Sequence, residues 1–452
     1  MADLADILRG IFLLAGLTLA TVSTAAEQAA FPLRISADGR HFVDASGEPF
    51  LMTGDTAWSL IGDLSREEAE LYMTSRERLG FNTLLVSLIE HHFSRDPPRN
   101  FYGDEPFGAG RPFSQPNEAY FDHAEWFLTK AQEHGFLVLL TPAYIGVNCG
   151  EQGWCGEMKA AGPAVLKNYG AYLAKRFAGF PNVVWIHGGD FDPVEKPLIE
   201  AVVEGMKSAG STALHGYHAS RDTAVRTVWD DAAWLDFDTL YTYGDIKPPA
   251  LERYRTAPPK PYILLEALYE GVTGANELQV RKAAYQALLA GAAGQVFGND
   301  PMWRFSGPGL DGGQIRWQDV LDSRGALSMM HLSALFRTLE WWKLEPVGAD
   351  LPASPVASAE ADLSVAAARD GSLVLAYASG PKAVYLKSSP MPATARWFDP
   401  SSGAITTAHG KPDGAGFVEF PVPAGTNASG QGDWLLILSR DDPARADLPR
   451  PD

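Results

Sequence analysis

The chain has 452 residues, of which 46% are hydrophobic and 20% are charged, a composition typical of a globular protein with more than one domain. The formal net charge is −18, from 37 basic and 55 acidic side chains. Nucleic acids and anionic membranes are bound by basic surfaces, so this balance argues against both partners.

The N-terminus resembles an export signal. Residues Ile11 to Ala25 form one apolar and small-residue run after Arg9. The run is too short for an ordinary membrane span and ends in small residues of the kind found at cleavage sites. We therefore predict a signal peptide over residues 1–26 and a secreted or periplasmic protein that has no membrane contact once the peptide is removed. The alternative is a buried N-terminal helix or a membrane anchor.

Two cysteines, Cys149 and Cys155, lie in the segment Cys-Gly-Glu-Gln-Gly-Trp-Cys. Two glycines between them allow the tight loop that a disulfide needs, and an exported protein would form that bridge. The alternative is a pair of free thiols. A zinc site is not predicted, because four ligands at metal spacing are not visible.

The first elements in chain order are a hairpin and then an alternation of β-rich and amphipathic runs. Residues 31–49 form the hairpin, in which Asp38-Gly39 is a turn signal. The later alternation predicts a parallel sheet covered by helices. Eight strands are expected at Phe50–Thr53, Thr83–Ser87, Leu137–Thr141, Val183–His187, Thr212–His215, Thr239–Thr242, Tyr262–Leu265 and Gln295–Gly298. The clearest helices are one that opens at the capping box Ser65–Glu68, and Tyr120–Glu133, Val165–Phe177, Leu278–Leu289 and Leu327–Trp342.

Eight such units predict a (β/α)8 barrel, a TIM barrel, over residues 27–347. A doubly wound sheet fits less well, because no glycine-rich phosphate loop follows the first strand. Residues 348–361 have the composition of a linker, and short strands over 362–440 predict a small antiparallel β-sandwich. Residues 441–452 are polar and are predicted to be disordered.

In a (β/α)8 barrel the active site lies at the carboxyl ends of the strands, and two carboxylates follow predicted strands there. Glu266 ends an apolar run, where a carboxylate is costly unless it is used or paired. Asp190 follows two glycines that remove side chains where a ligand must come close. Two carboxyl groups about 5–5.5 Å apart are what a retaining glycosidase needs. The alternative is that both are structural groups paired with Arg or Lys. Asp192 ranks below Asp190, because it precedes a proline and can simply start the next helix.

Six further residues end or follow predicted strands and are expected to bind substrate: Asp55, Trp58, His92, Tyr144, His187 and Trp303. Asp55 could instead cap the next segment, and Trp303 could instead belong to the core. His92 is expected to contact sugar rather than a metal ion, because adjacent histidines point in different directions. His215 and His218 are interpreted as packed or hydrogen-bonded histidines. No metal site and no cofactor are predicted.

Several segments in this order resemble the apiosidase-like glycoside hydrolases, family 140, which have a barrel of the DUF4038 type. They are Gly54-Asp55-Thr56-Ala57-Trp58, then Trp185-Ile186-His187-Gly188-Gly189-Asp190, then Leu265-Glu266. Further on, Ala395 to Pro400 with Gly403, and Gly432-Asp433-Trp434, resemble the collagen-binding-type β-sandwich that is often attached to this family. The segment Tyr241-Thr242-Tyr243-Gly244 differs from the family pattern.

The resemblance implies a retaining mechanism, with Asp190 as the acid/base and Glu266 as the nucleophile. It implies an oligo- or polysaccharide substrate from plants or microbes, with a furanoside such as apiose or arabinose among the candidates. The competing hypothesis is a non-catalytic carbohydrate- or matrix-binding protein on an inactive barrel. A metal-dependent amidohydrolase is disfavoured, because no His-x-His pair ends the first strand. The sequence makes no prediction of oligomeric state.

Overall fold

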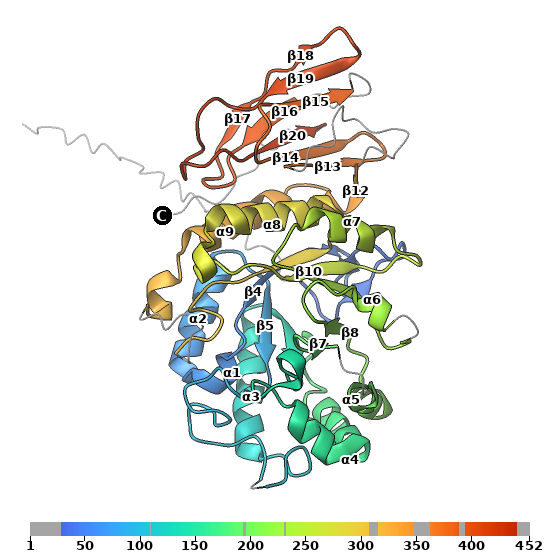
Figure 1. The fold of residues 1–452 in the computed structure, drawn as a ribbon, viewed down its shortest axis with the longest axis vertical. Coiled ribbons are helices and arrows are strands. Elements are labelled where there is room, and N and C mark those ends of the chain that lie inside the picture. The colour runs from blue at the N-terminus through green and yellow to red at the C-terminus, as the bar shows by residue number, and fades with distance from the viewer. Residues whose placement is uncertain are drawn as a thin grey trace, which may run out of the picture.

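The computed structural model describes residues 29–108, 110–192, 196–229, 232–306, 315–347, 362–387 and 394–440. The predicted signal peptide, linker and C-terminal tail lie outside these residues. The molecule is elongated, with the C-terminal strands at one end and helices α4 and α5 at the other (Figure 1). Of the helices in the described ranges, none is long and apolar enough to cross a membrane.

Eight parallel strands form the predicted barrel, in the hydrogen-bonded order β8-β7-β6-β5-β4-β11-β10-β9. A hydrogen bond of 2.6 Å from the Thr239 hydroxyl to the carbonyl oxygen of Tyr217 bridges the seam between β9 and β8. The strands are β4 (Met52–Thr56), β5 (Thr83–Ser87), β6 (Leu137–Thr141), β7 (Val183–Gly188), β8 (His215–His218), β9 (Asp238–Tyr241), β10 (Tyr262–Glu266) and β11 (Gly294–Phe297).

Helices follow the strands and cover the outside of the barrel, as the sequence alternation predicts. They are α1 (Leu60–Asp63), α2 (Arg66–Arg78), α3 (Glu118–Glu133), α4 (Cys155–Arg176), α5 (Pro197–Ser208), α6 (Val225–Val228), α7 (Lys247–Arg255), α8 (Glu277–Leu289) and α9 (Arg324–Phe336). Short 3-10 turns are η1 (Val147–Cys149), η2 (Val272–Gly274), η3 (Trp317–Val320) and η4 (Trp341–Lys343). The hairpin comprises β1 (Arg34–Ile35), β2 (Phe42–Val43) and β3 (Pro49–Phe50), which form an antiparallel sheet of their own.

The inside of the barrel is a packed apolar core, distinct from the larger core between strands and helices. Leu139, Val184 and Ile186 belong to the inner core, whereas Leu140 and Trp185 belong to the outer one. Successive residues of each strand therefore point alternately inward and outward, as the pleat requires. This alternation decides which strand residues can reach a site in the barrel mouth.

The fifth barrel strand differs most from its predicted position. The sequence predicts Thr212–His215, but β8 begins at His215 and ends at His218. Its residues, His-Gly-Tyr-His, lack the β-branched pattern of a strand. Position 216 requires a glycine, because a β-carbon there would lie 2.5 Å from the ring of Phe237. The shift places His218 at the carboxyl end of the strand.

The C-terminal residues form the predicted antiparallel sandwich of two sheets. One sheet has the order β12-β13-β14-β20-β16-β17 and the other has the order β15-β19-β18. The strands are β12 (Leu344–Pro346), β13 (Leu363–Ala368), β14 (Leu373–Ala378), β15 (Ala383–Lys387), β16 (Thr394–Phe398), β17 (Ile405–Thr407), β18 (Lys411–Pro412), β19 (Phe417–Pro421) and β20 (Trp434–Ser439).

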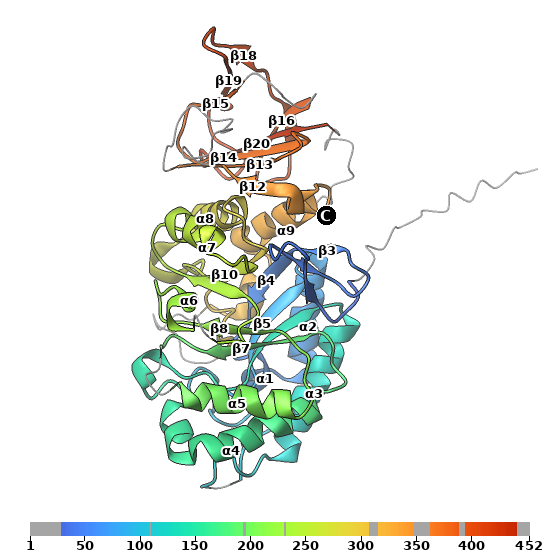
Figure 2. The ribbon, with the colours of Figure 1, turned by 90° about the vertical axis from the view of Figure 1, so that its right-hand side faces the viewer.

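The sandwich is stacked on helices α8 and α9, which are part of the barrel's outer layer, as both ribbon views show (Figure 2). The rings of Tyr285 on α8 and Tyr377 on β14 are stacked 4.7 Å apart. Arg281 of α8 is ion-paired with Asp433, and both side chains are fully buried. Apolar residues of the larger sheet, such as Leu375, belong to the barrel's outer core. The two domains therefore share one continuous interior.

Candidate active site

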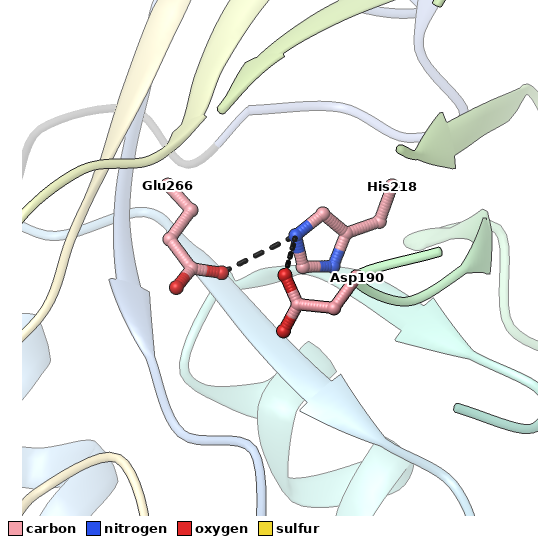
Figure 3. A group of neighbouring side chains, drawn as sticks. All are labelled: Asp190, His218 and Glu266. Carbon is pink, nitrogen blue, oxygen red and sulfur yellow. Dashed lines mark ion pairs between the residues drawn. The ribbon is translucent and has the colours of Figure 1, made fainter. Parts of the chain in front are cut away.

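Asp190, His218 and Glu266 meet at the barrel mouth, where they come from three different strand ends (Figure 3). One side-chain oxygen or nitrogen from each lies within 4.8 Å of the others. The sequence-predicted pair Asp190 and Glu266 is thus brought together. His218, interpreted from sequence as a packed histidine, lies between them.

Asp190 is held by an unusual backbone that runs from Gly188 through Gly189. These two glycines have φ angles of 87° and 125°, and Asp190 itself has φ 54°. A side chain at Gly189 would meet the ring of Tyr144 at 2.3 Å, so the glycines allow close packing of protein groups rather than of a ligand. An aspartate in the left-handed region is uncommon, and residues held in such conformations cluster at functional sites.

The carboxylate of Asp190 accepts a hydrogen bond of 2.8 Å from the hydroxyl of Tyr144. The Asp190 side chain remains 19% exposed, so one part of the carboxylate faces the cavity and solvent. Burial and the charge of Asp190 raise the pKa of Tyr144 well above its usual value, so this hydroxyl keeps its proton and stays a donor.

Glu266 reaches the barrel mouth because of a β-bulge. On β10, Leu264 pairs with Leu240 of β9 and Glu266 pairs with the next residue, Tyr241, so that Leu265 has no partner. Leu265 belongs to the inner core, and strict alternation would point the following residue outward. The extra residue resets the alternation, which is how bulges next to active sites re-aim a side chain.

Glu266 is only 5% exposed, and its carboxylate has two close polar contacts, one a hydrogen bond and one an ion pair. The hydroxyl of Tyr243 donates to Oε1 at 2.9 Å, and Nε2 of His218 lies 3.3 Å from Oε2. Burial is the largest influence on the pKa of Glu266 and raises it, and the nearby charge of Asp190 raises it further. The contacts from His218 and Tyr243 lower it, but the net direction is upward.

His218 is almost completely buried and its ring is stacked on Trp58, with ring centroids 5.6 Å apart and the planes 9° from parallel. Its Nε2 lies 3.3 Å from Glu266 and 3.9 Å from Asp190. Burial alone would lower the pKa of this imidazole, but the contact with Glu266 and the charge of Asp190 raise it above its usual value. The site therefore favours a protonated, cationic His218 between two carboxylates.

A cavity of about 220 Å³ opens in front of the two carboxylates. Most of its wall is aromatic or aliphatic. Its lining residues are Trp58, Ser87, Glu90, Phe93, Tyr144, Val147, Gln152, Asp190, Tyr241, Tyr243, Glu266, Leu268, Tyr269, Val272 and Trp303. Three of the six residues predicted to bind substrate, Trp58, Tyr144 and Trp303, are in this wall.

The other three predicted substrate contacts do not line the cavity. Asp55 is completely buried on the outer face of β4, where its Oδ2 lies 2.5 Å from Nε of Arg76 and accepts a hydrogen bond from Tyr72. The side chain of His187 likewise points outward, and its Nε2 lies 2.9 Å from Nδ1 of His215. Both residues lie at the ends of barrel strands, as expected from the sequence, but their side chains point away from the cavity.

His92 is the third residue that the structure places elsewhere. It is exposed, and its ring meets Phe93 edge-on at 4.9 Å, while Phe93 rather than His92 reaches the cavity. Glu90 fixes this loop, because its Oε1 accepts hydrogen bonds from the backbone amides of His91, His92 and Phe93. The loop therefore contributes an aromatic ring instead of an imidazole.

Cys149 and Cys155 form the predicted disulfide, with a Cα–Cα distance of 5.1 Å. Val147 and Gln152, which lie next to and within the bridged loop, line the cavity. Trp154, which lies within the bridged loop, is 4% exposed, and its indole donates to the carbonyl oxygen of Ile89. The bridge thus secures one wall of the site.

Asp190, His218 and Glu266 also form the one group of three or more potential metal ligands found within the described residues. A metal ion binds neutral imidazole, and metal binding displaces the proton. The raised pKa of His218 opposes that loss, since the two carboxylates stabilise the protonated ring. The arrangement suits proton and nucleophile chemistry better than metal binding.

Comparison with known proteins matches each of the two domains to a described family. Residues 36–343 match the family described as "Apiosidase-like, catalytic domain", and residues 356–439 match the "Putative collagen-binding domain of a collagenase". A search of curated proteins found no match.

Two solved structures are similar over nearly the whole chain. One, titled "Glycoside hydrolase", is 23% identical with a TM-score of 0.77, over 92% of this chain and 98% of its own. A glycoside hydrolase family 5 protein from Bacteroides vulgatus is 22% identical with a TM-score of 0.78, over 92% of this chain and 96% of its own. At these identities the two structures support the two-domain fold alone.

Proposed function

Because the chain belongs to the apiosidase-like family and is a glycoside hydrolase, we propose that it cleaves its glycosidic bond with retention of anomeric configuration. Asp190 is the acid/base and Glu266 the nucleophile. The observation that carries the proposal is the approach of the two carboxylates to within 4.8 Å in one cavity. Retaining enzymes hold these groups about 5–5.5 Å apart, whereas inverting enzymes need about 6.5–9.5 Å to admit a water molecule.

In the first step a carboxylate oxygen of Glu266 attacks the anomeric carbon. The bond from that carbon to the leaving oxygen breaks, and Asp190 transfers its proton to that oxygen. A proton on Asp190 also removes the negative charge that raises the pKa of Glu266, so protonation of one carboxyl favours ionisation of the other. The buried carboxyl of Glu266 is therefore ionised most readily when Asp190 is protonated, and the first step requires this combination.

In the second step Asp190 is a carboxylate and takes a proton from water. The water oxygen attacks the anomeric carbon, and the ester bond to Glu266 breaks to release the sugar and the free carboxylate. Tyr144 supports this change, because its hydroxyl donates to Asp190 at 2.8 Å and stabilises the anionic form.

His218 is a positioning residue in this scheme. Its Nε2 lies 3.3 Å from Oε2 of Glu266, while the hydroxyl of Tyr243 donates to Oε1. The two contacts fix the direction of the carboxylate. Stacking on Trp58 in turn holds the imidazole plane. A cationic His218 stabilises charge on Glu266 before attack and again as the ester bond breaks.

The family supports an oligo- or polysaccharide of plants or microbes as substrate, including a furanoside such as apiose or arabinose. The Cys149–Cys155 disulfide supports export, because such bridges persist in oxidising compartments. We accordingly place the enzyme outside the cell or in the periplasm. Detecting the mature protein in the culture medium or a periplasmic extract, cleaved after about residue 26, tests that placement.

The experiment is a screen of aryl glycosides, furanosides included, with wild type and three matched carboxylate variants. Glu266→Gln and Asp190→Asn are expected to lose at least about 10³-fold in kcat/KM on a substrate with a poor leaving group. Asp192→Asn is the control, because Asp192 accepts from the backbone amide of Ser220 and does not line the cavity. Wild-type rates in Glu266→Gln, or a loss confined to Asp192→Asn, would refute the assignment.

A further inference from the structure

Two aromatic side chains are exposed next to each other on the loop between β5 and α3. Phe101 is 43% exposed and Tyr102 is 49% exposed, and their ring centroids are 5.3 Å apart. Among the large exposed apolar side chains of the described residues, they are the one pair adjacent in sequence. A single exposed apolar side chain is ordinary, but a group of them rimmed by polar residues is a feature of binding surfaces.

Polar contacts hold the two rings in place. The side-chain oxygen of Asn100 accepts the backbone amides of Tyr102 and Asp104, each at 3.0 Å. The hydroxyl of Tyr102 accepts the backbone amide of Arg66, the first residue of α2, at 3.0 Å. Side chains that are fixed before a ligand arrives lose little conformational entropy when it binds.

Two arginines and a tryptophan flank the rings. The Cζ atom of Arg95 lies 5.5 Å from the centroid of the Phe101 ring, and that of Arg66 lies 5.9 Å from the centroid of the Tyr102 ring. Arg66 is also 5.1 Å from the ring of Trp126, which is partly exposed on α3. These distances are within the range of cation–π contacts. We call these five residues together the aromatic surface.

The composition of the aromatic surface suits a sugar ring. A sugar ring has apolar C–H groups on its face and hydroxyl groups around its edge. Aromatic rings offer a flat apolar surface to the C–H groups, and guanidinium N–H groups donate to hydroxyl oxygens. The aromatic surface provides both kinds of contact side by side, whereas a purely apolar partner would use only the rings.

The aromatic surface is connected to the catalytic cavity by one segment of chain. The loop between β5 and α3 begins at the carboxyl end of β5, and Phe93 of this loop lines the cavity. Arg95 follows two residues later, so its Cα atom is at most about 7 Å from that of Phe93. Its backbone amide donates to the buried carboxylate of Asp63 at 2.7 Å, while its guanidinium extends to Phe101. The segment therefore runs from the cavity wall to the exposed rings.

We propose that the aromatic surface is a second carbohydrate-binding site, which holds further sugar units of the chain that is cleaved at Asp190 and Glu266. This inference rests on the proposed function for the identity of the cavity as the sugar-cleaving centre. It goes further in naming the substrate as a chain of several sugar units. Such a chain extends from the cavity past Phe93 and Arg95 to the exposed rings.

The test is affinity electrophoresis in native gels that contain branched arabinan, arabinoxylan or pectin. The protein carries Glu266→Gln, so that the polysaccharide in the gel stays intact. At least one polysaccharide should retard this protein, and adding Phe101→Ala with Tyr102→Ala should raise the dissociation constant at least about tenfold, which corresponds to about 1.4 kcal/mol. Tyr385→Ala is the matched control and should leave the dissociation constant unchanged, because Tyr385 is an exposed tyrosine of the sandwich.

Tyr102→Phe separates the ring from the contact with α2. This change keeps the ring but removes the hydroxyl that accepts the amide of Arg66, so polysaccharide binding should be retained. Far-UV circular dichroism shows whether each variant is folded. If the double alanine variant is not folded, Phe101→Ala alone takes its place and should weaken binding in the same way.

Four results would overturn the inference. They are an unchanged dissociation constant in the folded alanine variant, an equal loss of binding in Tyr385→Ala, an equal loss in Tyr102→Phe, and no retardation by any of the three polysaccharides. Retardation that depends on the rings of Phe101 and Tyr102, without cleavage of any glycoside by wild type, would support the aromatic surface and refute the proposed function. Cleavage by wild type together with ring-independent retardation would refute the aromatic surface and leave the proposed function intact.

Discussion

Replacing Asp433 with alanine should strongly destabilise the protein without touching the catalytic site. Asp433 and Arg281 are both fully buried where the sandwich meets α8. Two guanidinium nitrogens each lie 2.8 Å from a carboxylate oxygen, which is a bidentate pair. Asp433 also accepts hydrogen bonds from Tyr377 and Asn427. The carboxylate is therefore the common partner of groups from both domains.

The expected cost follows from what remains after the change. Arg281 would keep only the hydroxyls of Ser328 and Ser429 as side-chain partners in the described structure, and its charge would stay buried. Removing one member of a buried ion pair costs about 3–5 kcal/mol, because the other charge is left uncompensated. We expect a loss of that size in the free energy of unfolding for Asp433→Ala.

The assay is urea unfolding followed by both far-UV circular dichroism and indole fluorescence, together with kcat/KM at a temperature where the variant is folded. The matched control is Asp362→Ala, because Asp362 pairs with Lys282 across the same domain boundary at 2.5 Å but is about half exposed. Exposed pairs contribute about 0–1 kcal/mol. If Asp433→Ala costs no more than Asp362→Ala, the reasoning about the shared interior is wrong.

Three more predictions concern the site and its surroundings. The raised pKa of Glu266 should place the acid limb of the kcat/KM profile above the ordinary glutamate pKa of about 4.3, so that activity is lost as pH falls. His218→Gln should move that limb to higher pH, because it removes a contact that lowers the pKa of Glu266. A limb at the same pH in His218→Gln would contradict the role of His218. Asp55→Asn should lower the free energy of unfolding by about 3–5 kcal/mol, because its partner Arg76 is fully buried, and should leave KM unchanged in the folded protein. A change in KM without a loss of stability would show instead that Asp55 contacts the sugar. Reducing the Cys149–Cys155 bridge should raise KM more than it lowers kcat, because the bridged loop forms part of the cavity wall. Unaltered KM and kcat after confirmed reduction would show that the bridge does not support the site.

The barrel could be predicted because its strands and helices alternate in the sequence, and the resemblance to a known family pointed to the same two carboxylates. The face of each strand could not be predicted. Both faces of a barrel strand are buried, so the pattern of apolar residues does not show which side chains point into the barrel and which point outward. Asp55 and His187 were expected to bind substrate from their place in the chain alone, but each is paired with a residue outside the barrel mouth.

The bulge in β10 and the shift of β8 were also invisible in the sequence. Alternation alone would turn Glu266 outward, and only the unpaired Leu265 brings it into the cavity. The missed residue His218 lies on a strand whose His-Gly-Tyr-His sequence lacks strand propensity. A polar inward position at the carboxyl end of a barrel strand is itself a functional signal, once the start of the strand is known.

The central claim is that Glu266 forms a covalent glycosyl ester and Asp190 assists each step, and chemical rescue by azide tests it most directly. Asp190→Ala is given an aryl glycoside with a good leaving group, which needs no proton, and azide then replaces the base-assisted water. The product should be a glycosyl azide whose NMR spectrum shows the anomeric configuration of the substrate, and Glu266→Ala should give no such product. An azide of retained configuration from Glu266→Ala, an azide of inverted configuration from Asp190→Ala, or full activity of Asp190→Ala on natural substrate would contradict the claim.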